Sequence, residues 1–231
     1  QLMHVPSTLL AMVDSSIGGK NGINLENRKN YLGTFYSSHY VHLDPTLLKT
    51  LPEKEFHNGV AEIIKYGAIK DPALLERMQT RLRVDDEDLE KIIGRCVKIK
   101  KYFVDQDEKD EGPRKALNFG HTIGHALELE YNLSHGQAIA IGMVYESQLL
   151  GLGRDKTKNI ITALKANKLP TKLPKNANIN KIIELMKSDK KGPLRFASDE
   201  TFYRIDRTEK DIREVLMEKI SERYEEEVLP F

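Results

Sequence analysis

The sequence that decides the fold reads Arg114-Lys115-Ala116-Leu117-Asn118-Phe119-Gly120-His121-Thr122-Ile123-Gly124-His125, and Ser134-His135-Gly136-Gln137 follows it. We expect a helix here, because apolar residues recur at helical spacing at positions 116, 117, 123, 126 and 127. Side chains four residues apart lie on one face of a helix, one turn apart. The imidazoles of His121 and His125 are therefore predicted to share a face, and Asn118, three residues before His121, is predicted to join them.

A third imidazole follows this predicted helix. His135 begins a new segment after the break at Tyr131-Asn132-Leu133-Ser134, so the chain can bring it back toward the first two. Two neutral imidazoles and one carboxylate from elsewhere would make a catalytic zinc site with an open position. A His-x-x-x-His pair taken alone is more often a polar helix face with satisfied histidines. Both interpretations stay open at this point.

Composition limits the classes of function. The chain has 231 residues, of which 39% are hydrophobic and 31% charged, as expected for a globular domain with a solvated surface. The net charge of +1 argues against a nucleic-acid footprint, which needs a clustered basic excess. A single cysteine, Cys96, fits a reducing compartment, and neither an apolar run of membrane-spanning length nor a signal peptide is present. We expect a soluble cytoplasmic protein with no membrane partner, and Gln1 begins in mid-pattern, as in part of a longer chain.

The first part of the chain predicts little regular structure. A short helix is expected over Pro6–Asp14, with Ser7 or Thr8 as its cap. The stretch 15–24 is predicted to be a glycine-rich loop whose one cation, Lys20, suits an anionic group, although such a segment is a simple turn as often as a binding loop. Its spacing does not match a nucleotide P-loop. A short buried strand is expected at 40–44, ending at Pro45.

From Thr46 onward the pattern becomes helical, so the fold class is mainly α. Thr50, as the cap, and Pro52, in the first turn, suit the start of a helix that continues through Tyr66. Glu62 and Lys65 lie in the most apolar part of this helix, where a charge is costly to bury unless it is paired or binds a metal. A surface ion pair between residues three apart is the open alternative.

Further helices are predicted at about 72–81, 86–105, 138–143, 156–167, 179–187 and 209–222. The helix at 86–105 is expected to carry an apolar stripe made by Ile92, Ile93, Cys96, Ile99 and Phe103, and the small, nearly unbroken apolar segment at 138–143 is expected to cross the centre of the core. An acidic, solvated connection at 105–111 is expected to bring Arg114 into place, and a strand at 202–205 is expected to pair with 194–196.

Four motifs occur in one order along the chain: Met12-Val13-Asp14-Ser15-Ser16-Ile17-Gly18-Gly19-Lys20, Gly59-Val60-Ala61-Glu62-Ile63-Ile64-Lys65-Tyr66-Gly67, Asn118 to His125, and Asp189-Lys190-Lys191. In these motifs the sequence resembles the 3-dehydroquinate synthases, members of the sugar-phosphate cyclase superfamily. The resemblance implies a Rossmann-like NAD-binding domain followed by a helical domain that holds zinc and substrate. Residues 1–45 would be a remnant of the NAD-binding α/β domain, and residues 46–231 the α-helical metal- and substrate-binding domain. This chain would then be the C-terminal portion, lacking most of the NAD-binding domain.

The resemblance also implies roles for individual residues. Zinc, or cobalt in its place, would be held by Glu62, His121 and His135. Contacts to the substrate and its phosphate would come from Asp14, Lys20, Asn30, Lys65, Lys100, Arg114, Asn118, His125 and Lys190, with Lys190 preferred to Lys191. Contacts to NAD would come from Thr8, Asp14, Lys20, Lys29 and Thr50. The family also implies a homodimer.

The implied reaction is that of a carbon–oxygen lyase of the shikimate pathway, which serves aromatic amino acid biosynthesis. It converts 3-deoxy-D-arabino-heptulosonate 7-phosphate to 3-dehydroquinate and phosphate. Transient oxidation by NAD, phosphate elimination, reduction and aldol closure follow one another. His125 is the candidate for proton transfer, because imidazole titrates near working pH. The alternative is that His125 is a hydrogen-bonding partner that orients His121.

Other functions remain open from the sequence. A related cyclase making a deoxyinosose or valiolone ring would keep the same chemistry, although Arg114 and Lys20 favour a substrate with a carboxylate. The pattern is also compatible with an inactive zinc-binding fragment or with a glycerol-dehydrogenase-like metal alcohol dehydrogenase. Three positions depart from the family pattern: Gln137 replaces the usual Glu, Asn21 a common Thr, and Asp110 a usual Glu.

Overall fold

The computed structural model describes residues 1–25, 28–189, 195–197, 204–218 and 222. Within these ranges it leaves out the side chains of residues 24–25, 28–31, 189, 195, 197 and 204–206. The described part is mainly helical, as predicted. Its α-helices are α1 (Glu53–Ile69), α2 (Pro72–Arg77), α3 (Leu89–Gln106), α4 (His121–Tyr131), α5 (His135–Leu149), α6 (Arg154–Ala166), α7 (Ile179–Asp189) and α8 (Glu209–Met217).

Short elements accompany the helices. They are the π-helix η1 (Ala11–Ser15), the 3₁₀ helices η2 (Pro45–Thr50) and η3 (Pro113–Asn118), and the strands β1 (Met3–His4), β2 (Lys20–Leu25), β3 (Arg28–Phe35), β4 (Tyr40–Val41), β5 (Arg195–Ala197) and β6 (Arg204–Asp206). The strands pair two by two: β1 with β4 in parallel, and β2 with β3 and β5 with β6 in antiparallel orientation. The pairing of 194–196 with 202–205 was predicted, and the pair Phe196↔Ile205 confirms it where the chain is described. Residues 194, 202 and 203 lie outside the described residues.

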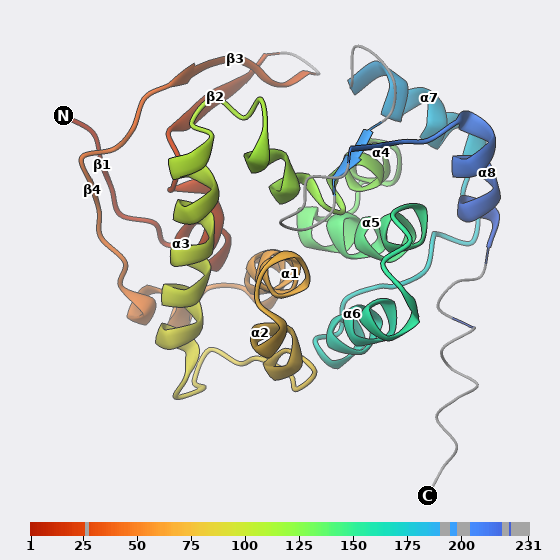
Figure 1. Ribbon diagram of the computed structural model, residues 1–231. Helices are drawn as coiled ribbons and strands as arrows, with labels where there is room; N and C mark the ends of the chain where they lie inside the picture. The colour runs from red at the N-terminus through yellow and green to blue at the C-terminus, as the bar shows by residue number, and fades with distance from the viewer. Residues whose placement is uncertain (26–27, 190–194, 198–203, 219–221, 223–231) are drawn as a thin grey trace, which may run out of the picture.

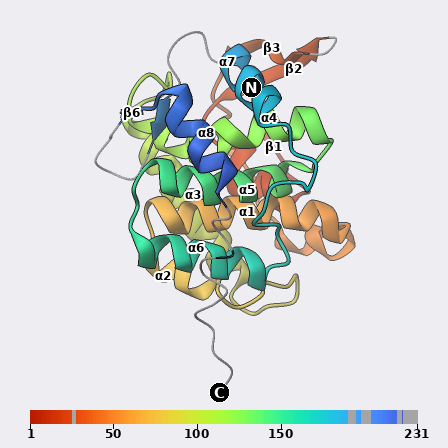
Figure 2. The same cartoon turned by 90° about the vertical axis from the view of Figure 1, so that its right-hand side faces the viewer.

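The core is built around α5. Almost every residue of this helix is buried, from Gly136 and Ala138 through Leu149. Figures 1 and 2 show α5 between α4 on one side and α1 and α6 on the other, and it contacts all three. The prediction that this small, apolar segment crosses the centre of the core is confirmed.

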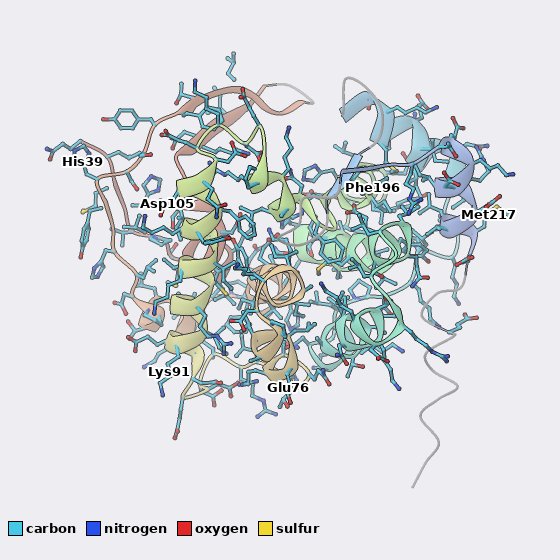
Figure 3. All side chains as sticks on the ribbon, viewed as in Figure 1. His39, Glu76, Lys91, Asp105, Phe196 and Met217 are labelled. Carbon is cyan, nitrogen blue, oxygen red and sulfur yellow. The ribbon has the colours of Figure 1, made fainter. Side chains whose placement is uncertain are left out.

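The apolar stripe predicted for the helix that follows Asp86 is also confirmed. Ile92, Ile93, Cys96, Ile99 and Phe103 are all buried, and they turn one face of α3 inward. On that face α3 contacts η1, α1 and η3. The charged residues Lys91, Glu76 and Asp105 are exposed, and Figure 3 shows Lys91 and Glu76 at the lower edge of the molecule. Within the described residues, none of the helices combines the length and apolar character that a bilayer span requires.

The predicted loop at 15–24 was wrong in part. Lys20–Leu25 forms β2 of a hairpin with β3, with partners such as Lys20↔Phe35 and Gly22↔Gly33. The glycines hid this from the sequence, because Gly is poor in strands and typical of turns. The turn itself is confirmed just before the strand, where Gly18 and Gly19 have positive φ of 96° and 69°. Asn21 stabilises the junction by donating from Nδ2 to the carbonyls of Gly19 and Tyr36.

The start of α1 also differs from the prediction. Pro52, and not Thr50, is the N-cap residue, and Thr50 closes η2. The predicted cap of the first helix agrees better, because Thr8 Oγ1 accepts a hydrogen bond from the backbone N–H of Ala11. The start of α5 shows why Gln137 is tolerated. Ser134 and Gln137 form a reciprocal capping box, in which a glutamine serves as well as a glutamate.

Candidate metal centre and its surroundings

Glu62 lies in the middle of α1 and is completely buried. Lys65, one turn later on the same helix, is 2% exposed and forms an ion pair with Glu62 Oε2. The alternative of a surface ion pair is therefore wrong. Burial would raise the pKa of the Glu62 carboxyl, but the ammonium group of Lys65 outweighs it and holds this pKa well below its usual range. Glu62 is thus an anion fixed inside the protein, where such a group needs close partners.

His135 is the first residue of α5, and its ring contacts Glu62 of α1. Its Nε2 lies 2.9 Å from Glu62 Oε1. Asn58 sets this approach, because its Oδ1 accepts a hydrogen bond of 2.7 Å from the backbone N–H of Gly136. Asn58 and Glu62 are four residues apart on α1, so the helix presents both to the start of α5. Gly136 permits the contact, since a Cβ there would lie 2.7 Å from Asn58 Cα.

His121 is the first residue of α4, and its Nε2 lies 3.4 Å from Glu62 Oε1. Its Nδ1 is 3.1 Å from the carbonyl oxygen of Phe119. A carbonyl can only accept, so Nδ1 carries the hydrogen of the neutral ring, and Nε2 presents a lone pair. Burial lowers the pKa of His121, which keeps the ring neutral at pH 7. The lone pair of Nε2 therefore faces a carboxylate oxygen, which also only accepts.

This arrangement suits a cation. One ligand atom each from Glu62, His121 and His135 can be chosen such that all lie within 4.8 Å of one another. Two acceptors that face each other call for a proton or a metal ion between them. In the metal-free chain, burial would lower the pKa of His135, but Glu128 and Glu62 outweigh it and raise the pKa to about 9. A histidine–histidine–carboxylate set of this kind is the ligand set of a catalytic zinc ion.

Two further side chains border the three candidate ligands. The ring of His125 lies edge-on to that of His121, with the centroids 5.3 Å apart, so the predicted shared face of α4 is confirmed for these two residues. Glu128, one turn later on α4, approaches His135 Nδ1 to 3.7 Å through Oε2. Asn118 does not join this face. It ends η3, and Gly120, with φ +81°, breaks the chain direction before α4 begins.

A second buried cluster lies where η1, α1 and α3 meet. Asp14 Oδ1 accepts hydrogen bonds from Lys100 Nζ at 2.7 Å and from the hydroxyl of Tyr66 at 2.5 Å. Burial would raise the pKa of Asp14, but Lys100 and Lys65 outweigh it and lower the pKa to about 2. Burial lowers the pKa of Lys100 itself, although Asp14 opposes the shift. Two lysines, Lys65 and Lys100, are thus held among carboxylates beside the candidate metal ligands.

Arg114 and Lys20 connect the N-terminal turn to the segment before α4. Arg114 is 3% exposed and donates from Nη2 to the carbonyl of Gly18 and from Nη1 to the carbonyl of Glu108. Glycine suits position 18, because the backbone there has φ +96°, a conformation that other residues rarely adopt. Lys20, which is half exposed, forms an ion pair with Asp110. The prediction that the acidic connection brings Arg114 into place is confirmed.

The remaining predicted site residues are spread more widely. Thr50 is exposed and precedes α1, whereas Glu62 lies in the middle of that helix. Lys29 and Asn30 belong to β3, but their side chains lie outside the described residues, and so does all of Lys190. The roles implied for these residues and for Thr8 therefore stay predictions.

Two polar residues that shape this site were missed by the sequence reasoning. Asn58 anchors the start of α5, and Glu146, which is completely buried, accepts hydrogen bonds from the start of α4. Asn58 gave a weak signal, one turn before Glu62. Glu146 gave a stronger one, because it follows the apolar run from Ala138 to Val144, where a carboxylate needs a partner. The reasoning applied to Glu62 would have found it.

Solved structures of sugar-phosphate cyclases share this fold. A 2-epi-5-epi-valiolone synthase from Streptomyces hygroscopicus subsp. jinggangensis 5008, solved with NAD⁺ and Zn²⁺ bound, matches with a TM-score of 0.80 at 24% identity and covers 96% of this chain and 66% of its own. A 2-deoxy-scyllo-inosose synthase, complexed with carbaglucose-6-phosphate, NAD⁺ and Co²⁺, matches with a TM-score of 0.74 at 23% identity and covers 93% of this chain and 66% of its own. These two likenesses show that the chain shares its fold with these enzymes.

Sequence comparison defines the family. Residues 1–58 match the family model described as 3-dehydroquinate synthase N-terminal, and residues 59–192 match 3-dehydroquinate synthase C-terminal. A curated relative, the 3-dehydroquinate synthase of Nostoc punctiforme, is 43% identical over 211 residues, which cover 84% of this chain. This chain belongs to the 3-dehydroquinate synthase family. It spans 58% of the length of that relative.

Proposed function

We propose that this chain carries the metal- and substrate-binding part of a 3-dehydroquinate synthase. Such an enzyme converts 3-deoxy-D-arabino-heptulosonate 7-phosphate to 3-dehydroquinate and phosphate. The observation that carries the proposal is the buried Glu62 carboxylate, on which the Nε2 atoms of His121 and His135 converge at 3.4 and 2.9 Å. The identity to curated 3-dehydroquinate synthases favours this enzyme over the other cyclases, whose likeness concerns the fold.

In this proposal Glu62, His121 and His135 are the ligands of a zinc ion, which cobalt can replace. When bound, the metal supplies Lewis-acid polarisation of the substrate hydroxyl. NAD, with contacts proposed from Thr8, Asp14, Lys20, Lys29 and Thr50, supplies the hydride acceptor and donor. Lys65 compensates the charge of the buried Glu62 and keeps its carboxylate ionised.

The cationic groups around this centre are proposed to bind the anionic parts of the substrate. Lys65, Lys100 and Arg114 are buried close to η1 and η3, and Lys20 lies at the edge of the turn that Arg114 holds. An ammonium group suits phosphate as a point charge, and a guanidinium suits a carboxylate through two parallel hydrogen bonds. Asn118, Asn30 and Lys190 are proposed as further polar contacts to the same substrate.

His125 is proposed as the residue that transfers protons. It lies beside His121, on the same face of α4. The alternative role, orienting His121, is already filled by the carbonyl of Phe119, which accepts from Nδ1. General acid–base catalysis by a positioned side chain typically contributes a factor of about 10²–10⁴ to a rate.

Phosphate release from the heptulosonate phosphate, measured on the zinc-loaded chain with and without NAD, tests the proposal. We expect release that depends on NAD, and about 10²–10⁴-fold slower release in His125→Ala with unchanged zinc content. His39→Ala is the matched control, because His39 is exposed and lies at the edge of the molecule in Figure 3. Zinc binding without release would refute the activity of this chain, and equal rates in His125→Ala would refute the role of His125.

The homodimer and the cytoplasmic location implied by the resemblance also belong to this proposal. Sedimentation equilibrium of the purified chain tests the first, with a mass of about two chains expected.

A further inference from the structure

The start of α4 lacks a side-chain cap of its own. Gly120 occupies the N-cap position with φ +81° and offers no side chain to the first turn. The first N–H groups of an α-helix have no acceptor within the helix, so they need one from outside. His121 is the first residue of α4, and its direction therefore depends on what holds this turn.

Glu146 of α5 holds it. Its side chain is completely buried, and both of its carboxylate oxygens accept hydrogen bonds from α4. Oε2 accepts from the backbone N–H of Gly120 at 2.8 Å, and Oε1 accepts from the backbone N–H of Ile123 at 2.9 Å. These two donors flank His121 in the sequence. A negative group is also favourable here, because the N-terminus of a helix carries partial positive charge.

The backbones of the two helices are in direct contact beside this carboxylate. Gly142 lies one turn before Glu146 on α5, and a Cβ at position 142 would lie 1.9 Å from the carbonyl oxygen of Gly120. A Cβ at Gly124 would lie 2.7 Å from Ile139 Cδ1 and 3.1 Å from the carbonyl oxygen of Ala138. The contact fixes the distance between the helices, and the two hydrogen bonds of Glu146 fix the orientation of the first turn.

We infer that Glu146 is a positioning residue for the proposed metal centre, because it holds the start of α4 so that His121 Nε2 faces Glu62. Glu146 lies on α5, which begins with His135. Helix α5 therefore supplies one candidate ligand directly and fixes a second through Glu146. This role rests on the proposed function and deepens it. Glu146 acts through the backbone of α4, and this separates it from Glu128, which approaches the ring of His135 itself.

A carboxylate is required because two N–H donors must be satisfied at once. Glutamine has nearly the same shape but offers a single acceptor oxygen, and its NH₂ group would face the second donor. Hydrogen bonds to an ionised acceptor are also about twice as strong as neutral ones. Glu146→Gln therefore loosens the first turn of α4 while it preserves the packing volume.

The test is a cobalt titration of the metal-free full chain, followed by optical absorption. We expect about 10–100-fold weaker cobalt binding in Glu146→Gln, the range typical of residues that orient metal ligands, together with changed d–d absorption bands. Ser147→Ala is the matched control, because Ser147 is equally buried, adjacent, and donates to the carbonyl of Val144 in its own helix. It should leave affinity and spectrum unchanged.

The outcomes separate this inference from the proposed function. If the unaltered chain binds no cobalt, the proposed metal centre is wrong and this role falls with it. If the unaltered chain binds cobalt and Glu146→Gln binds it equally well with the same spectrum, the role of Glu146 alone is wrong.

Amide hydrogen exchange of the metal-free chain guards against a general folding defect. We expect at least about tenfold faster exchange at the Gly120 and Ile123 amides in Glu146→Gln than in Ser147→Ala, with the rest of α5 equally protected in both. Unchanged exchange at both amides would overturn the inference.

Discussion

The contact between α4 and α5 can be measured by comparing the free energies of unfolding of two glycine-to-alanine variants, Gly142→Ala and Gly94→Ala. Gly142 of α5 touches Gly120, and an added Cβ would lie 1.9 Å from the Gly120 carbonyl oxygen, so the two helices would have to separate by about 1 Å. Gly94 of α3 also lies inside a helix, but a Cβ there meets no atom within 4 Å. Gly142→Ala and Gly94→Ala therefore make the same chemical change, and only the first forces two backbones apart.

The expected magnitudes follow from two terms. Replacing glycine by alanine inside a helix stabilises by about 1 kcal/mol, which should appear in full in Gly94→Ala. In Gly142→Ala the overpacking cost opposes this gain, and we place it at or above the upper end of the usual range of about 1–3 kcal/mol because backbone atoms must move. We expect a net loss of about 2 kcal/mol, and a difference of about 3 kcal/mol between the variants.

Urea unfolding of both variants, followed by far-UV circular dichroism, measures these free energies. Each 1 kcal/mol should also shift the melting temperature by about 2–4 °C for a chain of this size. Equal stability of Gly142→Ala and Gly94→Ala would refute the direct contact between α4 and α5, on which the positions of His121 and His135 depend.

Three further predictions test other parts of the structure. Lys100→Met should raise the pKa of Asp14, which is lowered from 3.8 to about 2 in the folded chain. The lowered pKa gives stability that is present above about pH 3.8 and is lost toward pH 2, so the variant should unfold at higher pH in an acid titration. Lys101→Met, on the exposed neighbour, should not change the unfolding pH. Chelation of zinc held at 100 times its dissociation constant should remove about 2.7 kcal/mol of stability, seen as a lower melting temperature, and His121→Ala should show no such effect. Gln137→Glu should raise the free energy of unfolding in urea by about 0.3–1 kcal/mol, because it keeps the capping box and adds a negative charge at the start of α5; a loss would contradict the cap.

The helical part of the fold could be read from the sequence because its signals are local. Apolar spacing located α1, α3, α6 and α7 to within about three residues at each end, and the inward stripe of α3 was predicted residue by residue. It gave α5 only in its central part and began α4 too early, within η3. The hairpin of β2 and β3 was not found, because its glycines weaken the strand signal. Asn118 was placed on the wrong element for a related reason. The left-handed backbone at Gly120 ends the regular spacing, and helical periodicity does not carry across such a break.

Sequence reasoning predicted the charged residues of the candidate site but missed the residues that hold the helix starts in place. Glu62 and Lys65 stood out because charges in an apolar run need partners, and the structure gives them partners. Asn58 and Glu146 act by accepting hydrogen bonds from the backbone at the start of another helix. Which backbone they reach depends on how α1, α4 and α5 pack, and this is not visible along the chain. Glu146 alone could have been suspected, from its place after an apolar run.

The most direct test of the account is the metal content of the purified chain, measured by mass spectrometry after dialysis against limiting zinc. We predict one zinc ion per chain, and its loss in Glu62→Ala, His121→Ala and His135→Ala alike. A chain without zinc, or one that keeps a full equivalent in His121→Ala, would contradict the assignment of these three residues as the metal centre.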